Sequence, residues 1–184
     1  ADGGGDESVF TVKRGGKVLT QVWWSNVDTM GTCGRAVQLC NEWKVDVLKV
    51  DPIGIGAGVT SRLKELNGEG IIKAEVYGVN VAEKSNDPFK FENKRDEIFY
   101  GLADRFRDNE IDLSAIQDSE ELFSQLVSIK KDKPTSKGQL KVAKKDHSNS
   151  PDRADSLALA FGIVKESTVS VIFDDIREFP DDDD

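Results

Sequence analysis

Polar and apolar residues alternate at the start of the chain and then change to helical spacing. Residues 8–13 alternate, residues 14–17 read Arg-Gly-Gly-Lys, and residues 18–24 are rich in β-forming side chains. This pattern predicts an antiparallel hairpin with a glycine turn. Residues 29–43 place apolar side chains three or four positions apart, which predicts a helix.

Predicted strands and helices then alternate along the chain. In order, they are a strand at 45–50, a helix at about 59–66, a strand at 71–77, a loop at 80–91, helices at 93–107 and 119–127, a short strand at 139–143, and a helix that starts at 151. This order, after an opening hairpin, predicts an α/β fold with a mixed sheet and helices on both faces of the sheet.

The last of these helices opens with Ser-Pro-Asp-Arg-Ala-Asp at 150–155. Ser150 has the properties of an N-cap, and Pro151 suits the first helical position. Asp152 and Asp155 are three residues apart and therefore share one face of the first turn. They are candidate metal ligands, and the alternative is that they only complement the helix dipole.

A further carboxylate, Asp51, stands at the carboxyl end of the strand predicted at 45–50. Ligands of open α/β sheets bind just beyond such strand ends. The glycines that follow lie at 54, 56 and 58 and do not match the G-x-G-x-x-G or the phosphate-loop pattern, which favours a cation over a nucleotide. The alternative is that Asp51 caps the next helix or its turn.

Charge is distributed unevenly along the chain. The formal net charge of −9 argues against broad nonspecific DNA affinity. Residues 130–145 nevertheless hold seven lysines against one acid, and residues 174–184 hold seven acids against one arginine. The lysine-rich segment is expected to be either a hairpin along a phosphate backbone or a solvated loop. Its candidate DNA contacts are Lys131, Lys133, Lys137 and Lys141.

Five other positions carry weaker candidates. Lys94 and Arg95, at the start of the helix predicted at 93–107, could bind phosphate or simply solubilise the helix. His147, the only histidine, could reach a metal or a phosphate or be solvated. Cys33 and Cys40 lie on one helix face and are expected to pack in a core, in keeping with a reducing cytoplasm. No apolar run reaches the ~18 residues of a membrane span.

Together, these motifs resemble the C-terminal nuclease domain of large terminase subunits from tailed bacteriophages. The resemblance rests on the Gly-rich opening at 2–8, the hairpin, Asp-Pro-x-Gly-x-Gly at 51–56, Asn-Lys-Arg at 93–95 and Ser-Pro-Asp-Arg-Ala-Asp at 150–155, and it covers roughly residues 1–165. It implies a ribonuclease-H-like fold and a metal-dependent endonuclease that cuts concatemeric viral DNA during genome packaging.

Site residues and partners follow from that resemblance. Asp51 is expected to bridge two Mg²⁺ or Mn²⁺ ions and Asp155 to bind the second, with Asp152 and Asp6 as supporting ligands; hard ions prefer such oxygen donors. The expected partners are double-stranded DNA, an ATPase domain in the same full-length chain, the portal and the small terminase subunit. The expected location is the cytoplasm of the infected bacterial host, with no membrane contact.

The resemblance also implies domain limits. In such domains the first catalytic carboxylate ends a strand that lies just before the position of Ala1. We therefore expect a nuclease domain at 1–167 that lacks part of its first strand, and an acidic tail at 168–184.

Two other functions stay open at this point. One is another ribonuclease-H-like nuclease with the same acids, such as a Holliday-junction resolvase. The other is a noncatalytic module that docks on the packaging motor.

Overall fold

The computed structural model describes residues 7–144 and 150–163. Its first strands, β1 (Ser8–Arg14) and β2 (Lys17–Trp24), form the predicted antiparallel hairpin. Gly15 turns the chain with a φ of +58°, a conformation that glycine adopts without steric cost. A Cβ at Gly16 would come within 2.1 Å of the carbonyl oxygen of Glu110, so this position requires glycine for close packing.

The next helix, α1 (Thr29–Trp43), occupies the range predicted from its spacing. The Asp28 carboxylate caps it by accepting a hydrogen bond from Gly31 N at 2.7 Å. Lys44 ends it in the left-handed conformation, with a φ of 51°. Caps at both ends therefore support the helix that the apolar spacing predicted.

A strand–helix–strand unit follows, made of β3 (Val47–Val50), α2 (Gly56–Gly68) and β4 (Glu75–Gly78). The two strands pair in parallel, with Val47 opposite Glu75 and Val50 opposite Gly78. β4 starts four residues later than predicted, because Ile71 N and Ile72 N still bond to Leu66 O at the end of α2.

Three helices complete the described fold: α3 (Lys94–Arg107), α4 (Glu120–Ser128) and α5 (Asp152–Phe161). Between α4 and α5, residues 130–144 form an irregular hairpin. The strand predicted at 139–143 is wrong, because Leu140 forms a bridge with Phe91 and Val142 forms one with Lys131. The pairing partner changes within three residues, so only isolated bridges form.

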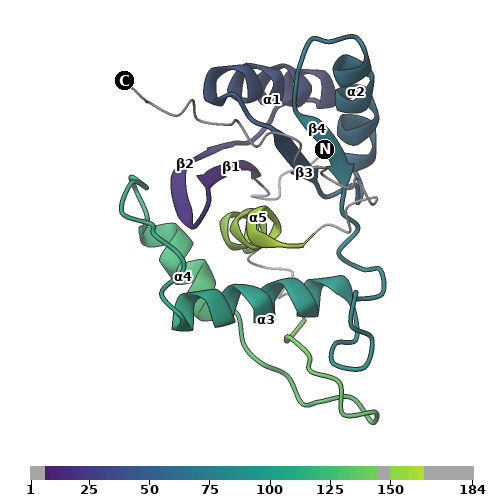
Figure 1. Ribbon diagram of the computed structural model, residues 1–184, viewed down its shortest axis with the longest axis vertical. Helices are drawn as coiled ribbons and strands as arrows, with labels where there is room; N and C mark the ends of the chain where they lie inside the picture. Colours follow the sequence, from purple (N-terminus) through teal and green to yellow (C-terminus); the bar gives the residue numbers. More distant parts are fainter. Residues whose placement is uncertain (1–6, 145–149, 164–184) are drawn as a thin grey trace, which may run out of the picture.

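The helices lie on both sides of the strands, as predicted (Figure 1). On one side, α1 and α2 pack on the strands through a core that includes Leu63, Cys33 and Cys40. On the other side, α3, α4 and α5 enclose a second core around Leu157. Both cysteines are free and buried, which confirms the packing role expected for them, and burial raises the pKa of Cys40 to about 11.

The described strands form two separate pairs rather than one continuous sheet. β1 pairs with β2 and β3 pairs with β4, and no hydrogen bond joins β1 to β3 within the described ranges. The mixed strand directions match the prediction, but the facing edges of β1 and β3 stay apart. Between them lies a cavity of about 1110 Å³, lined by the full length of both strands and by α5.

Some predictions lie outside the described residues. These include Asp6, His147, and the proposed boundary between the nuclease domain and the acidic tail. Within residues 7–144 and 150–163, no helix is both long and apolar enough to cross a membrane.

Candidate active site

The first turn of α5 carries two of the candidate ligands, and its start differs in detail from the prediction. The N-cap is Pro151, and the helix begins at Asp152. Ser150 does not cap the helix as predicted: its Oγ lies 2.5 Å from Asp152 Oδ1. The other oxygen of Asp152 accepts a hydrogen bond from Glu7 N at 2.8 Å. Asp152 is therefore held between the start of β1 and the segment that precedes α5.

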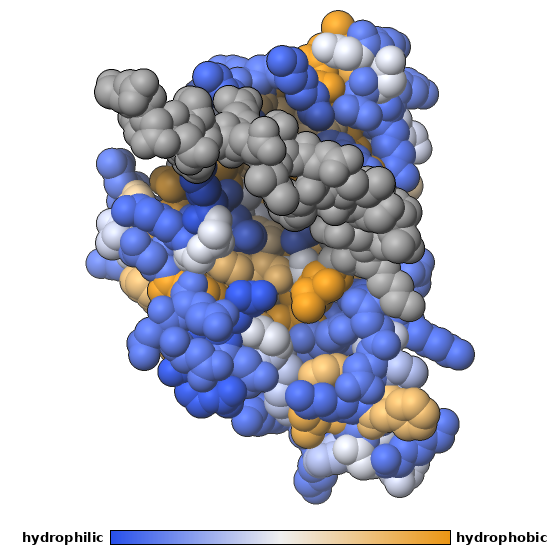
Figure 2. Space-filling model, in the orientation of Figure 1, coloured by the Kyte–Doolittle hydropathy of each residue, from blue (hydrophilic) through white to orange (hydrophobic). Residues whose placement is uncertain are grey.

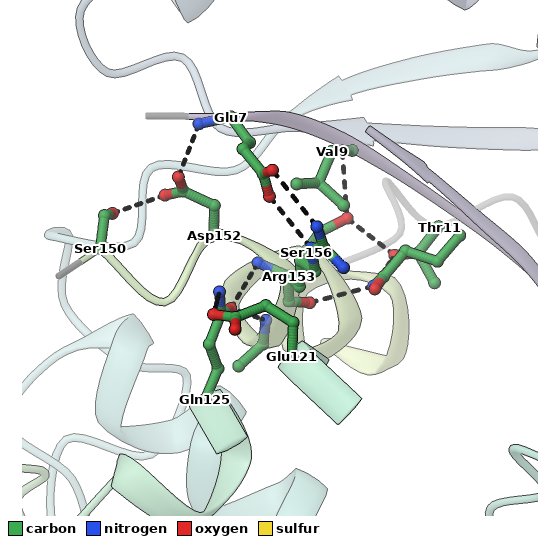
Figure 3. Close-up of polar contacts among 11 residues, drawn as sticks. Glu7, Val9, Thr11, Glu121, Gln125, Ser150, Asp152, Arg153 and Ser156 are labelled. Carbon is green, nitrogen blue, oxygen red and sulfur yellow. Dashed lines mark hydrogen bonds and ion pairs between the residues drawn. The ribbon is translucent and has the colours of Figure 1, made fainter. Parts of the chain in front are cut away.

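A side chain from α4 caps α5 in place of Ser150. Gln125 Oε1 accepts hydrogen bonds from Arg153 N at 2.8 Å and from Ala154 N at 3.1 Å (Figure 3). Gln125 Nε2 in turn donates to Glu121 Oε1 at 2.9 Å. Because first-turn N–H groups have no partner inside a helix, this glutamine satisfies two donors that burial would otherwise strand.

Arg153, between the two aspartates, points into the protein and not toward a ligand. Its guanidinium makes a two-pronged contact with Glu7, at 3.0 and 3.3 Å, and lies 3.7 Å from the centroid of the Trp23 ring. The side chain is only 10% exposed, and that of Glu7 is 23% exposed. This ion pair fixes α5 against the opening of β1, with the planar geometry that arginine provides.

Polar side chains join the next turn of α5 to β1 as well. Ser156 Oγ donates to Val9 O at 3.1 Å and lies 2.8 Å from Thr11 Oγ1. Gln21 Nε2, from β2, reaches both Thr11 Oγ1 and the carbonyl of Arg153 (Figure 3 shows the α5 side of this network). The register of α5 on the hairpin, and with it the position of its acids, is therefore set by several contacts at once.

Sequence patterns did not identify Gln125, Arg153 or Glu7 as supports of the site. Gln125 is 28 positions from Arg153, whose backbone N–H donates to it, so no local motif connects them. The only available signal was an arginine placed between two acids at the start of an apolar helix, a charge that needs a partner when it is buried.

Asp51 follows β3, as predicted, and its Oδ1 accepts a hydrogen bond from Ile53 N at 3.1 Å. The glycines after it serve the backbone. Gly54 has a φ of +63°, and a Cβ at Gly56 would lie 1.8 Å from the carbonyl oxygen of Asp51. The loop therefore folds tightly over the strand end, which explains why its sequence is rich in glycine.

Asp51, Asp152 and Asp155 all line the cavity between the two strand pairs. Their carboxylate oxygens are suitable donors for a hard divalent ion. Within the part of the chain that the structure describes, however, no three or more His, Cys, Asp or Glu side chains lie close enough to hold a metal ion. The donor chemistry fits the predicted metal centre, while its assembly from these acids stays a prediction.

The far end of the same cavity is basic. Lys49 Nζ donates to the carbonyls of Ala160 and Gly162, at 3.0 and 2.6 Å, and so ties β3 to the end of α5. Burial, with the nearby charges of Lys13 and Arg105, lowers the pKa of Lys49 to about 8. The hydrogen bonds that Lys49 donates to helix-end carbonyls favour its charged form, so burial has the stronger effect on its pKa. Apolar side chains gather in the middle of this face (Figure 2).

The start of α3 places its two predicted DNA contacts differently. Lys94 is 9% exposed and pairs with Glu97 at 3.0 Å, so its charge is satisfied inside the protein and does not face a DNA phosphate. Arg95 lines the cavity and donates from Nη1 to the carbonyl of Ala143 at 3.1 Å. Arg95 therefore lies between the acids and the end of the basic hairpin.

The lysines of the hairpin at 130–144 differ in their surroundings. Lys133 and Lys137 are exposed, and Lys131 lies 5.5 Å from the centroid of the Tyr100 ring. Lys141 pairs with Glu92 at 2.9 Å, and that hydrogen bond raises its pKa. The hairpin lies at the lower end of the molecule (Figure 1), and its exposed lysines face solvent there.

Comparison with solved structures identifies this arrangement of elements. The chain is similar to the nuclease domain of the large terminase subunit of bacterial virus Sf6, with a TM-score of 0.77 and 23% identity over 89% of this chain and 85% of that one. A lysine-to-alanine mutant of that domain with manganese gives a TM-score of 0.72 and 22% identity over 84% and 82% of the two chains. A mutant form with calcium gives 0.76 and 22% over 89% and 86%.

No protein-family model matches this sequence, and no curated protein sequence matches it significantly. The similarity is therefore one of three-dimensional arrangement, and it extends over most of both chains. The chain has the ribonuclease-H-like fold of terminase nuclease domains.

Proposed function

We propose that this chain is the nuclease domain of a large terminase subunit and cuts concatemeric viral DNA during genome packaging with the aid of divalent metal ions. The observation that carries the proposal is a shared fold over 89% of the chain with Asp51, Asp152 and Asp155 lining one cavity. The neighbours crystallised with manganese and calcium support a divalent ion as cofactor.

The metal centre would be held by Asp51 and Asp155, with Asp152 in support. Asp6, outside the described residues, is proposed as a further ligand. Two Mg²⁺ or Mn²⁺ ions, when bound, would supply a Lewis acid, an activated water and stabilisation of the leaving oxygen. The protein's own contribution is to fix the carboxylates, since mutual repulsion of clustered acids would otherwise spread them.

The contacts described above perform that positioning. Ser150 and the backbone of Glu7 hold Asp152, while Gln125 and the Arg153–Glu7 pair fix the first turn of α5. Asp51 is oriented by its hydrogen bond to the backbone of the glycine loop. The affinity for metal would depend on how firmly these contacts hold the carboxylate oxygens, because the groups that orient metal ligands tune a metal centre.

DNA would reach the acids across the hairpin at 130–144. This segment is the densest cationic stretch in a chain of net charge −9, and Arg95 joins its end to the cavity. The proposed phosphate contacts are Lys131, Lys133, Lys137 and Lys141 of the hairpin, together with Arg95 of α3. An ATPase domain in the same full-length chain, the portal and the small terminase subunit are proposed as partners in the cytoplasm of the bacterial host.

A cleavage assay tests the proposal. The substrate is supercoiled plasmid with Mn²⁺ or Mg²⁺, and the protein is this chain extended by the strand that the resemblance places before Ala1. We expect Asp51→Asn and Asp155→Asn to abolish nicking and linearisation, and Asp152→Asn to reduce them. Asp108→Asn, at the exposed end of α3, is the matched control and should cleave normally.

Full cleavage by Asp51→Asn in otherwise required metal would refute this site. A preference for four-way junctions over linear duplex would favour the resolvase alternative. Binding of metal and DNA without any cleavage would favour a noncatalytic docking module.

A further inference from the structure

Phe89 presents an aromatic ring almost entirely to solvent. Its exposed fraction is 93%, whereas Phe91, two residues later, is 7% exposed. A phenylalanine side chain can bury about 150–250 Å² of surface. Leaving it exposed to water therefore loses a large hydrophobic contribution to stability. Single exposed apolar side chains are common on folded proteins, so the surroundings of this ring decide what it contacts.

The loop that carries Phe89 is held firmly. Asp87 Oδ1 accepts hydrogen bonds from Phe89 N and Lys90 N, both at 3.2 Å. Ser85 Oγ, which is buried, donates to Phe91 O at 3.1 Å, and the Phe91 ring packs against Tyr100 with centroids 5.7 Å apart. The ring of Phe89 is therefore exposed by a defined turn that is anchored in the core at the next aromatic residue.

This loop is also bound directly to the basic hairpin at 130–144. Gln139 Nε2 donates to Pro88 O at 2.7 Å, and Leu140 N donates to Lys90 O at 2.8 Å. The residue on each side of Phe89 is thus bonded to the hairpin. At this lower end of the molecule, apolar groups stand among strongly hydrophilic ones (Figure 2).

The charges around the ring select its partner. Lys90, Lys133 and Lys137 are exposed lysines of the loop and the hairpin, whereas Lys141 is already paired with Glu92. Apolar rings that contact other proteins lie in patches depleted of lysine. An exposed ring in a loop that is hydrogen-bonded to a lysine-rich hairpin matches the alternation of base faces and phosphates in nucleic acid.

We propose that Phe89 and the exposed lysines beside it form one DNA-contact surface, in which the ring inserts against a base step of the duplex while the lysines hold the flanking phosphates. Apolar wedges of this kind partly unstack the step that they enter. The proposal deepens the nuclease function above and rests on duplex DNA being the substrate. It gives the hairpin a second role, to fix where along the strand the DNA is held.

Two variants separate the ring from the charges. Phe89→Ala should weaken binding to a short duplex by about fivefold to 150-fold, since one base–aromatic contact is worth about 1–3 kcal/mol, without changing the slope of log affinity against log salt. Lys137→Gln should instead flatten that slope by about 0.9. Val127→Ala, at an 81% exposed apolar position on α4, is the matched control and should bind as the unmodified protein does.

Binding is measured without metal ions, by fluorescence anisotropy at several salt concentrations. A second duplex carries 2-aminopurine, whose fluorescence should rise on binding of the unmodified protein and stay low with Phe89→Ala. Unchanged affinity and an unchanged 2-aminopurine signal in Phe89→Ala would overturn the inference, and the ring would then be a contact for protein.

The outcome can be told apart from that of the cleavage assay. If the unmodified protein cuts DNA and the Phe89→Ala variant binds DNA with unchanged affinity, only the inference about Phe89 is refuted. A protein that depends on Phe89 for binding but never cuts refutes only the nuclease proposal. Failure of the unmodified protein to bind duplex DNA would overturn both.

Discussion

Gln125→Ala removes the side chain that caps α5 from outside the helix. In the structure, Gln125 Oε1 accepts from Arg153 N and Ala154 N, and the glutamine is 6% exposed. Ala154 is fully buried and Arg153 is 8% exposed, so solvent does not readily replace the lost acceptor. The substitution therefore strands two backbone donors at the turn that carries Asp152 and Asp155.

The expected loss follows from these contacts. A buried donor left without a partner costs about 1–3 kcal/mol, and loss of a helix cap typically costs about 1 kcal/mol. The two donors belong to one capping contact, and Glu121 loses its partner as well. We therefore expect Gln125→Ala to lower the free energy of unfolding by about 2–4 kcal/mol, a large share of the stability of an ordinary domain.

Urea unfolding followed by tryptophan fluorescence measures this loss, because Trp23 lies on Arg153 at the same end of α5. Gln38→Ala, at an exposed position of α1, is the matched control and should change stability by less than about 0.5 kcal/mol. A loss below about 1 kcal/mol in Gln125→Ala, or one equal to that of the control, would refute the capping role.

Other substitutions test the remaining supports. Arg153→Ala should destabilise the fold by about 3 kcal/mol in urea, because it leaves Glu7 without its partner; a loss below about 0.5 kcal/mol would mean that the pair contributes nothing. Leu157→Ala, at a fully buried position, should cost about 2–5 kcal/mol by calorimetry, and a smaller loss would indicate a core that collapses around the gap. The lowered pKa of Lys49 means that the unfolded chain binds a proton that the folded chain lacks between pH 8 and 10.5, so stability relative to Lys49→Met should rise with pH in that window. Because Lys49 is only partly buried, the free energy of unfolding should change by less than about 1 kcal/mol per pH unit. Cys40 has the opposite effect above pH 9, but it is present in both proteins and cancels from their difference. A difference in stability that stays flat or falls with pH would contradict the lowered pKa of Lys49.

Elements with local signals were predicted well from sequence. The opening hairpin is specified by alternation around Gly15 and Gly16, and α1 by its spacing and by Asp28 at its start. In both, the residues that define the element also satisfy its backbone groups. The position of Asp51 at the end of a strand followed in the same way, from a short apolar run that stops at a glycine loop.

Features that depend on distant parts of the chain were missed. Serine is a common N-cap residue, yet Gln125 and not Ser150 caps α5, because α4 packs across the start of α5. Lys94 reads as a surface cation at a helix start, but its pairing with Glu97 under the loop at 80–93 buries it. Periodicity likewise does not determine which strand edges meet, so the pairing of β1 with β2 and of β3 with β4 could not be read from spacing alone.

The gap between β1 and β3 has a consequence for the behaviour of the chain in concentrated solution. Within the described residues, each strand is hydrogen-bonded on one edge only, and the other edge faces the cavity. Unpaired edges act as templates for another strand, and folded proteins usually cover or charge them. Here the two templates face each other across one cavity, so an extended segment that enters it would be hydrogen-bonded on both sides at once. Self-association of this chain should therefore grow with concentration and proceed by strand exchange instead of by contact between its outer helices.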